Sequence, residues 1–133
     1  NDSAFWAAQD SVMKTNYFDT ITGFFDTYHI STALAKAVMF DTSIQLSQYT
    51  VSDLAASTTS AVGTIGSEHV KESDWIQEFI KQRINKLNDM GGAYAGTTER
   101  LNPFTQLLNQ GDLDFDSGAI NVSIYNSDLS IYC

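Results

Sequence analysis

One segment, residues 72–88, constrains what the chain can fold into more than any other. Its sequence is ESDWIQEFIKQRINKLN, and its apolar residues recur at helical spacing. We therefore expect a helix that Ser73 caps, with acidic residues in its first turn. Arg83 falls within the apolar stripe, three residues after Ile80 and four before Leu87. A buried arginine is costly unless a carboxylate meets it, so the fold must supply an acid from elsewhere in the chain.

The leading candidate for this acid is Asp41, on a second predicted helix over residues 32–47. Ser31 and Thr32 can cap this helix at its N-terminus. Most of its surface is apolar, so we expect it to lie in the centre of the fold. Asp41 and Lys36 are its only charged residues, which makes Asp41 the natural partner of a buried guanidinium.

A second arginine can join this pair. Arg83 and Arg100 are the only arginines in the 133-residue chain. A carboxylate between two guanidinium groups can be held bidentately, which determines both its position and its ionisation. Such a network commonly orients another ionisable group. The more frequent alternative is an ion-pair network that serves only the fold.

The N-terminal part is also predicted to be helical. A first helix begins after Asp2 or Ser3 and runs to about residue 15, with Phe5 and Trp6 among its apolar positions. Residues 17–28 are rich in aromatic side chains and favour a second helix or a bent continuation of the first. The aromatic side chains here are expected to belong to the core, although aromatic rings can also stack on sugars.

The later segments alternate between loops and helices. Residues 52–56 suggest a short helical turn, residues 55–67 a polar surface loop, and residues 91–96 a flexible glycine-rich loop. A last helix is expected over residues 99–110, capped by the preceding threonines. Pro103 stands in its first turn, and a glycine follows its end.

Beyond Gly111 the apolar residues alternate with polar ones, which is the period of a strand. The sequence Asp-Ser-Gly at residues 116–118 is a turn signal. The predicted fold is therefore mainly α, a single helical domain or lobe over residues 1–133 with a small C-terminal β-hairpin or extended tail.

Composition excludes several classes of function. The net charge is −9, with seven scattered Lys and Arg residues, which argues against nucleic-acid binding. The same acidity suits a cationic ligand. No segment is apolar enough to span a membrane. With 43% hydrophobic residues the chain can still bury a real core.

Cys133 is the only cysteine and the last residue, so the sequence indicates neither a disulfide framework nor a metal site of the CxxC type. We predict no cofactor and no bound metal. No signal peptide is evident. The sequence begins at Asn1 rather than at a methionine, and we expect a fragment or a processed product.

A first group of polar residues, Glu68 and His69 with Glu72 nearby, could carry acid–base chemistry or hold a metal. It lies at the end of a polar loop without a second histidine at ligand spacing. A solvated surface run is therefore the favoured interpretation. His29, beside a tyrosine at a helix junction, is expected to be packed or half-exposed.

A second group, Asp112, Asp114 and Asp116, resembles part of a calcium loop. It lacks the twelve-residue frame and the closing glutamate of such loops. The solvent face of a strand is the favoured interpretation. The nucleophile, zinc-hydrolase, P-loop and dinucleotide motifs are all absent from the sequence, and we identify no catalytic residue by this route.

Several short blocks resemble, in the same order, the C-terminal part of glycoside hydrolase family 46, the chitosanases of the lysozyme-like superfamily. Residues 8–10 and 17–19 resemble the family's "AQ…YFD" region. Phe40-Asp41-Thr42 resembles its "YDA" helix, and Thr98-Glu99-Arg100 its "TEQR" segment. Residues 108–115, LNQGDLDF, resemble "LKAGNLDL".

In that family an aspartate and two arginines form a buried network that supports the catalytic glutamate. The resemblance places these roles on Asp41, Arg83 and Arg100. The family's general-acid glutamate and general-base aspartate lie in an N-terminal lobe that has no counterpart here. The sequence also departs from the family at Leu46-Ser47, where the family has His-Gly at an edge that contacts substrate.

The resemblance implies inverting hydrolysis of a β-1,4-linked amino-sugar polymer, either chitosan or peptidoglycan. This chain would form one wall of the cleft beside an N-terminal lobe, in the same or a cleaved chain, and would be inactive alone. We expect an extracellular or virion-associated protein. The alternative is a non-catalytic glycan-binding or structural module, for example in a phage tail or cell-wall assembly.

Overall fold

The computed structural model describes residues 2–13, 19–67, 69–114, 119–124 and 127–132, and the fold is mainly helical, as predicted. The elements are, in chain order, α1 (Asp2–Met13), α2 (Asp19–Thr27), α3 (Ala33–Gln45), α4 (Gln48–Val62), α5 (Glu72–Met90), α6 (Gly92–Ala95), the 3₁₀ helix η2 (Thr98–Leu101), α7 (Asn102–Gln110), β1 (Ala119–Ile124) and β2 (Ser127–Tyr132).

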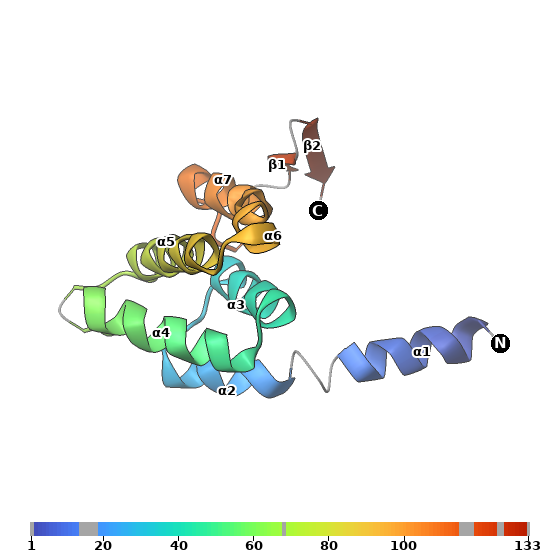
Figure 1. Cartoon of the computed structure of the whole chain (residues 1–133), viewed down its shortest axis with the longest axis horizontal. Coiled ribbons are helices and arrows are strands. Elements are labelled where there is room, and N and C mark those ends of the chain that lie inside the picture. The colour runs from blue at the N-terminus through green and yellow to red at the C-terminus, as the bar shows by residue number, and fades with distance from the viewer. Residues whose placement is uncertain (1, 14–18, 68, 115–118, 125–126, 133) are drawn as a thin grey trace.

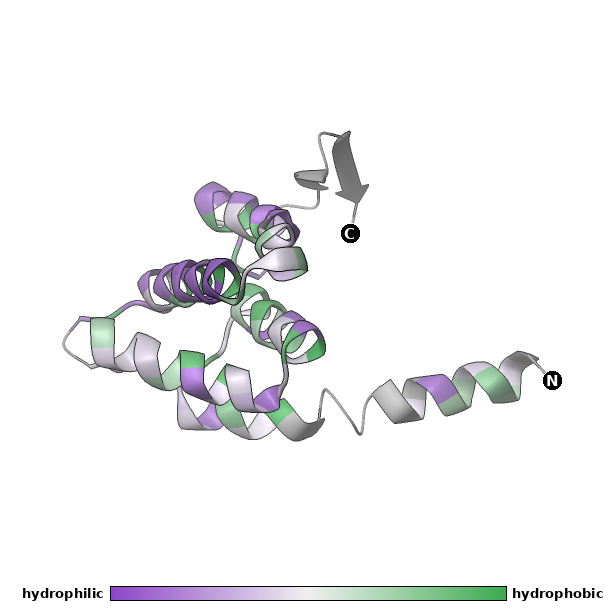
Figure 2. Ribbon diagram, in the orientation of Figure 1, coloured by the Kyte–Doolittle hydropathy of each residue, from purple (hydrophilic) through white to green (hydrophobic). Residues whose placement is uncertain are grey.

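The core is built around α3, which lies in the middle of the helical body and contacts α2, α4, α5 and α7 (Figure 1). Leu34, Val38 and Met39 of α3 are fully buried. From α5, Trp75 and Phe79 enter the same core with their rings stacked at a centroid distance of 5.5 Å. Figure 2 shows α5 as mostly hydrophilic along its length, so its contribution to the core is confined to one stripe.

The prediction of a loop over residues 55–67 is wrong for residues 55–62, because α4 continues to Val62, and is confirmed for residues 63–67. Its buried residues are Val51, Leu54, Ala55 and Thr58. They recur at helical spacing, but two of the four, Ala55 and Thr58, are small or polar and give a weak apolar pattern. Tertiary contacts supply what the pattern lacks: α4 packs against α3 and α5, and Trp75 Nε1 donates to Thr59 Oγ1 at 3.1 Å.

The ends of two helices differ from the predictions. α5 begins at Glu72 after Lys71, and no side-chain hydrogen bond caps it in the described structure, so the Ser73 cap is wrong. The loop predicted over residues 91–96 contains the short helix α6. The last helix divides into η2 and α7. Thr97 stands at the N-cap position of η2, as predicted, but its side chain makes no capping hydrogen bond there. Pro103 in the first turn of α7 and Gly111 in a left-handed conformation at its end are confirmed.

Glu72 contacts the N-terminus of α3 instead of solvent, which corrects the prediction of a solvated surface run at this residue. Its Oε1 accepts from the backbone N–H of Ser31 at 2.7 Å, and its Oε2 from that of Thr32 at 2.7 Å. Thr32 is the N-cap of α3, as predicted, and its hydroxyl accepts from Ala35 N–H at 3.3 Å. A carboxylate at this position also complements the positive end of the helix dipole.

The segment after α7 completes this arrangement. Asp114 Oδ1 accepts from Ala33 N–H at 3.0 Å, and the Leu113 carbonyl accepts from Leu34 N–H at 2.8 Å. Residues 112–114 form loop and turn rather than a strand, so the strand interpretation of the aspartate run is wrong for Asp112 and Asp114. Asp116 and the turn predicted at 116–118 lie outside the described residues. Four consecutive backbone donors, residues 31–34, are thereby satisfied from outside α3.

The C-terminal end is a β-hairpin. β1 and β2 are antiparallel, with Ile120 opposite Ile131 and Val122 opposite Leu129. β1 lies against α7. The alternating apolar pattern therefore does indicate strands, although the two strands form later in the chain than Leu113.

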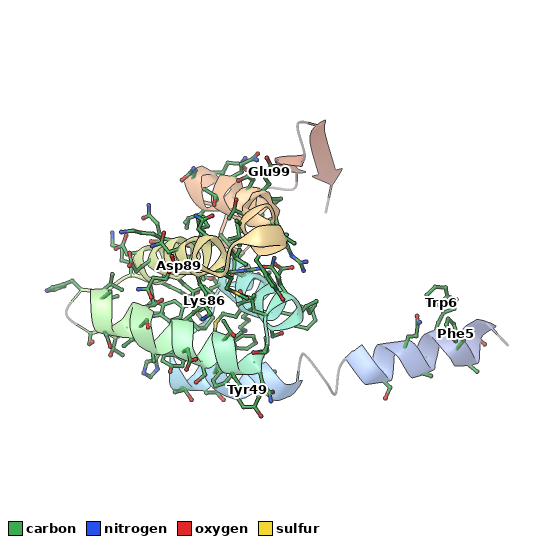
Figure 3. All side chains as sticks on the ribbon, in the orientation of Figure 1. Phe5, Trp6, Tyr49, Lys86, Asp89 and Glu99 are labelled. Carbon is green, nitrogen blue, oxygen red and sulfur yellow. The ribbon has the colours of Figure 1, made fainter. Side chains whose placement is uncertain are left out.

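At the other end, α1 lies apart from the helical body (Figure 1). Phe5 and Trp6 are 59% and 60% exposed, and their rings meet edge-to-face at a centroid distance of 5.7 Å. Figure 3 shows the two side chains near the N-terminal end of α1, away from the core, which corrects the expectation that they are core residues. Within the described ranges, the helices are too short or too polar to span a bilayer.

We predict that Glu72→Ala lowers the free energy of unfolding by about 1–2 kcal/mol, because two backbone donors of the α3 N-terminus lose a charged acceptor. Chemical denaturation measures this change. Glu78→Ala on the same helix is the control. Within the described part of the chain, Glu78 contacts only its helical neighbours: it accepts a hydrogen bond from Gln82 and pairs with Lys81. Its change should stay within about 0.5 kcal/mol. Equal effects of the two substitutions would contradict the capping role.

Candidate functional site

Asp41 lies between the two arginines of the chain. Arg83 Nη2 donates to Asp41 Oδ2 at 2.8 Å. Arg100 Nη2 donates to Oδ1 at 2.6 Å, and Arg100 Nε lies 3.0 Å from both carboxylate oxygens. The three predicted residues, from α3, α5 and η2, therefore meet. We call this group the Asp41 cluster.

Arg83 is the buried member of the Asp41 cluster, with 0% of its side chain exposed. Besides Asp41, its guanidinium bonds Thr42 Oγ1 at 2.8 Å and Gln45 Oε1 at 2.5 Å. Its Nε is buried without a hydrogen-bond partner in the described part of the chain. The acid partner expected for an arginine in the α5 stripe is thus present. The uncharged oxygens of Thr42 and Gln45 also accept hydrogen bonds from the Arg83 guanidinium.

Sequence reasoning missed Thr42 and Gln45. A signal for Gln45 was available, because it stands four residues after Asp41 and shares its face of α3. Thr42 carries no such signal. Its hydroxyl also donates to the Val38 carbonyl at 2.7 Å, a bond within the helix that leaves a lone pair for Arg83.

The outer side of the Asp41 cluster faces solvent. The Arg100 side chain is 38% exposed, and that of Asp41 is 20% exposed. The backbone N–H of Arg100 donates to the Thr97 carbonyl at 3.1 Å, which anchors the turn that carries this side chain. One guanidinium is therefore locked inside the fold, and the other presents part of its surface outward.

Burial and charge act against each other on Asp41. Burial raises the pKa of the Asp41 carboxyl, but hydrogen bonds and positive charge from Arg100 and Arg83 outweigh it, so the pKa lies below its ordinary value of 3.8. Burial lowers the pKa of Arg83, and the bond to Asp41 offsets part of this effect. An arginine remains protonated in proteins, so all three groups of the cluster are charged near neutral pH.

The other candidate residues do not join the cluster. Glu72 and Asp114 bond the N-terminus of α3, as described above, and His29 and His69 are exposed. Glu68 and Cys133 lie outside the described residues. Among those described, His, Cys, Asp and Glu side chains form no group of three that could hold a metal ion.

Two hollows of the surface lie elsewhere. One, of about 580 Å³, follows the outer face of α5 between Glu78 and Met90, where Figure 3 shows Lys86 and Asp89. The other, of about 220 Å³, lies between α5 and α7 over Ile84 and Leu108. Neither is lined by a member of the Asp41 cluster, so the cluster lies outside both hollows.

Comparison with known proteins identifies the family. The sequence model of glycosyl hydrolase family 46 matches residues 1–118. The chain belongs to this family. The resemblance in the short sequence blocks is thereby confirmed, and the helical fold of the family 46 chain agrees with those of solved relatives.

Chitosanases are among the relatives of this family 46 chain. It is 33% identical over 91 residues to the chitosanase of Bacillus subtilis strain 168. The aligned residues make up 65% of this chain and 33% of that protein. The native chitosanase from Bacillus subtilis MY002 superposes with a TM-score of 0.86 at 25% identity, over 98% of this chain and 58% of that chain. A Gynuella sunshinyii chitosanase in complex with chitotetraose superposes with a TM-score of 0.85 at 23% identity, over 98% of this chain and 57% of that chain. At this identity the likeness supports the fold alone.

The family 46 chain therefore spans somewhat more than half the length of these solved relatives and about a third of the curated one. Its membership of the family is established.

We predict that Arg83→Ala lowers the free energy of unfolding by about 3–5 kcal/mol, because Asp41 loses its fully buried partner. Urea denaturation measures the change. Lys81→Ala, two residues earlier on α5, is the control: Lys81 is 69% exposed and 3.9 Å from Glu78. Its change should stay within about 0.5 kcal/mol. A similarly small change for Arg83→Ala would show that the cluster contributes little to the fold.

The stabilising effect of Asp41 should depend on pH. Because its pKa in the folded chain is below 3.8, its contribution is present above that value and is lost as pH falls through the folded-state pKa. We predict that the stability difference between the wild type and Asp41→Asn is constant above about pH 5 and shrinks below about pH 4. Urea denaturation across this range tests it. A difference that stays constant to about pH 2 would contradict a lowered pKa.

Proposed function

We propose that this chain is the C-terminal part of a family 46 glycosidase that hydrolyses a β-1,4-linked amino-sugar polymer. The observation that carries the proposal is the Asp41 cluster, with one guanidinium fully buried and the other partly exposed. Arg83 fixes the carboxylate from inside, and the carboxylate fixes Arg100 through two of its nitrogens. A guanidinium held in this way is suited to orient a further carboxylate that approaches from outside.

The charges of the Asp41 cluster suit a general acid as that further carboxylate. Two arginines and one aspartate leave a net positive charge. A neighbouring positive charge lowers the pKa of a carboxyl group, which opposes holding the proton that a general acid must deliver. The negative charge of Asp41 cancels one of the two positive arginine charges. Arg100 can therefore orient a catalytic glutamate while lowering the pKa of that glutamate less than two uncompensated arginines would.

Two carboxylates close to the start of α3 already have a structural task, which supports an acid supplied by a preceding lobe. Glu72 and Asp114 are engaged at the N-terminus of α3. Glu99 is exposed and precedes Arg100 in η2 (Figure 3). Inverting glycosidases need two carboxyl groups about 6.5–9.5 Å apart across a cleft. We propose that this chain forms one wall of that cleft and that the second lobe brings the glutamate and aspartate.

Chitosan is the favoured substrate. A mutant of the Bacillus subtilis MY002 chitosanase has been solved with 6 GlcN, and the Gynuella enzyme with chitotetraose. The net charge of −9 would attract a cationic glycan. Peptidoglycan stays an alternative because Leu46 and Ser47 replace the family's His-Gly, and Leu46 packs against the core rather than offering a polar group. Either polymer places the proposed action outside the cell.

One observation favours a second candidate function, a non-catalytic glycan-binding or structural module. Phe5 and Trp6 form an exposed aromatic pair, and aromatic faces can stack on sugar rings. A module of this kind could keep the family 46 fold without turnover, for example in a phage tail or cell-wall assembly.

Reducing-end release from chitosan and from peptidoglycan tests the proposal. We predict no release by the 133-residue chain alone and release by the full-length product of its gene, which Arg100→Ala lowers by about 100-fold, because the catalytic acid loses its orientation. The better of the two polymers identifies the substrate.

Two results would contradict the proposal in different ways. Binding to either glycan without release by the full-length product would establish the non-catalytic alternative. Release by the 133-residue chain alone would mean that the acid lies within it, and Glu68, Glu72 and Glu99 would then be tested by substitution with glutamine.

A further inference from the structure

Gln45 uses both ends of its side-chain amide. It lies one turn beyond Asp41 on α3, and its Oε1 accepts from Arg83 Nη2 at 2.5 Å. Its Nε2 donates to Thr97 Oγ1 at 2.9 Å. An amide carries an acceptor and a donor at its tip, so it can join a buried cation on one side to a hydroxyl on the other. Gln45 therefore links Arg83 of α5 to the segment just before Arg100.

Thr97 passes this link on to Arg100. Its hydroxyl donates to the Tyr94 carbonyl at 2.7 Å, which leaves a lone pair for Gln45. Its carbonyl accepts from the backbone N–H of Arg100 at 3.1 Å. The Gln45–Thr97 hydrogen bond, which we call the Gln45–Thr97 bridge, thus ends on the turn from which the Arg100 side chain leaves the backbone.

Apolar packing does little to hold the segment just before this turn, whereas Leu101 at the end of η2 is buried in the core. α6, all four of whose residues are described, buries none of them. Gly91 precedes α6 and Gly92 opens it, with φ of 68° and 55°, and a Cβ at either position would meet nothing within 4 Å. Segments with few buried contacts open locally at low cost. The polar contact to α3 therefore holds this segment at Thr97, where apolar packing is weak.

We propose that Gln45 and Thr97 are positioning residues that hold Arg100 on Asp41 and so set the orientation of the exposed guanidinium. The geometric part of this inference concerns the 133-residue chain alone. Its catalytic consequence rests on the proposed function, in which Arg100 orients a glutamate from a preceding lobe. Because Arg83 Nη2 bonds both Asp41 and Gln45, the buried arginine then sets the outer one along two routes.

The first experiment measures solvent exchange of the Arg100 Nε–H proton by NMR in the 133-residue chain. Thr97→Val keeps the shape of the side chain and removes the hydroxyl, and we expect exchange about tenfold faster because one hydrogen bond that holds the turn is lost. Gln45→Leu removes the other partner of the Gln45–Thr97 bridge and should also make Arg100 Nε–H exchange faster. Thr97→Ser, which keeps the hydroxyl, should exchange like the wild type.

Thr27→Val is the matched control. Thr27 also donates its hydroxyl to a backbone carbonyl, that of Gly23 at 2.9 Å, but it lies on α2 away from the Asp41 cluster. Its substitution should leave Arg100 exchange unchanged. Wild-type exchange in both Thr97→Val and Gln45→Leu would overturn the inference, because Arg100 would then be held without the Gln45–Thr97 bridge. Gln45→Asn, which shortens the amide by one methylene, decides the matter if the other variants do not fold.

The second experiment uses the full-length protein. Thr97→Val should lower kcat about tenfold and leave KM within about twofold, because orientation of the acid rather than substrate binding is lost. The alkaline limb of the kcat profile should move to higher pH, since a loosened Arg100 lowers the pKa of the neighbouring glutamate less. Thr97→Ser should restore both.

The two experiments separate the inference from the proposed function. If the wild-type full-length protein releases no reducing ends, the proposed function fails, and Arg100 exchange still decides whether the bridge positions Arg100. If exchange rises in Thr97→Val while kcat and the alkaline limb stay unchanged, the catalytic role of the bridge is overturned. A purely structural bridge would lower the melting temperature and leave the pH profile unmoved.

Discussion

The rest of the structure depends on the contact between the buried guanidinium of Arg83 and the carboxylate of Asp41. An uncompensated charge at a site with no solvent exposure is among the costliest errors a fold can contain. α3 must therefore turn Asp41 toward α5. Once α3 is rotated in this way, Leu34, Val38 and Met39 occupy the core that α4 and α5 close. One ion pair thus determines both the orientation of the central helix and the place where Arg100 can bind.

Both ends of α3 are tied by charged groups from distant parts of the chain. Glu72 and Asp114 satisfy backbone donors at its N-terminus, and Arg83 and Arg100 hold Asp41 in its last turns. α5 supplies a contact to each end of α3: Glu72, its first residue, bonds the N-terminus, and Arg83, on its buried stripe, bonds Asp41. A shift of α3 along α5 would break contacts at both ends together. The carboxylate at the centre of the proposed site is therefore carried on a rigid element, which is what positioning another ionisable group requires.

Much of this could be predicted from the sequence where a strong physical rule applied. The stripe of α5 is unambiguous, and an arginine within it demanded an acid. Only two arginines and one charged acid on an apolar helix were available, so the three residues of the cluster were few enough to name. α4 was predicted as only a short turn over residues 52–56, because the buried residues that follow Leu54 are Ala55 and Thr58, which bury too little apolar surface to stand out from a loop. Gln45 and Thr97 were missed because uncharged hydrogen-bonding groups impose no comparable demand: either can be satisfied by water when left outside.

The sequence by itself determined the mainly helical class, the family, the central helix and the acid that its buried arginine needs, because periodicity and the cost of a buried charge are local properties of the chain. Only the tertiary structure decided which groups act as hydrogen-bond and charge partners for these elements. Glu72 lies beside α3 rather than in solvent because two helices converge there, and Phe5 and Trp6 lie outside the core because α1 stands apart from it. Contacts between segments far apart in the chain depend on how the helices pack, and packing is a property of the whole fold rather than of any one stretch.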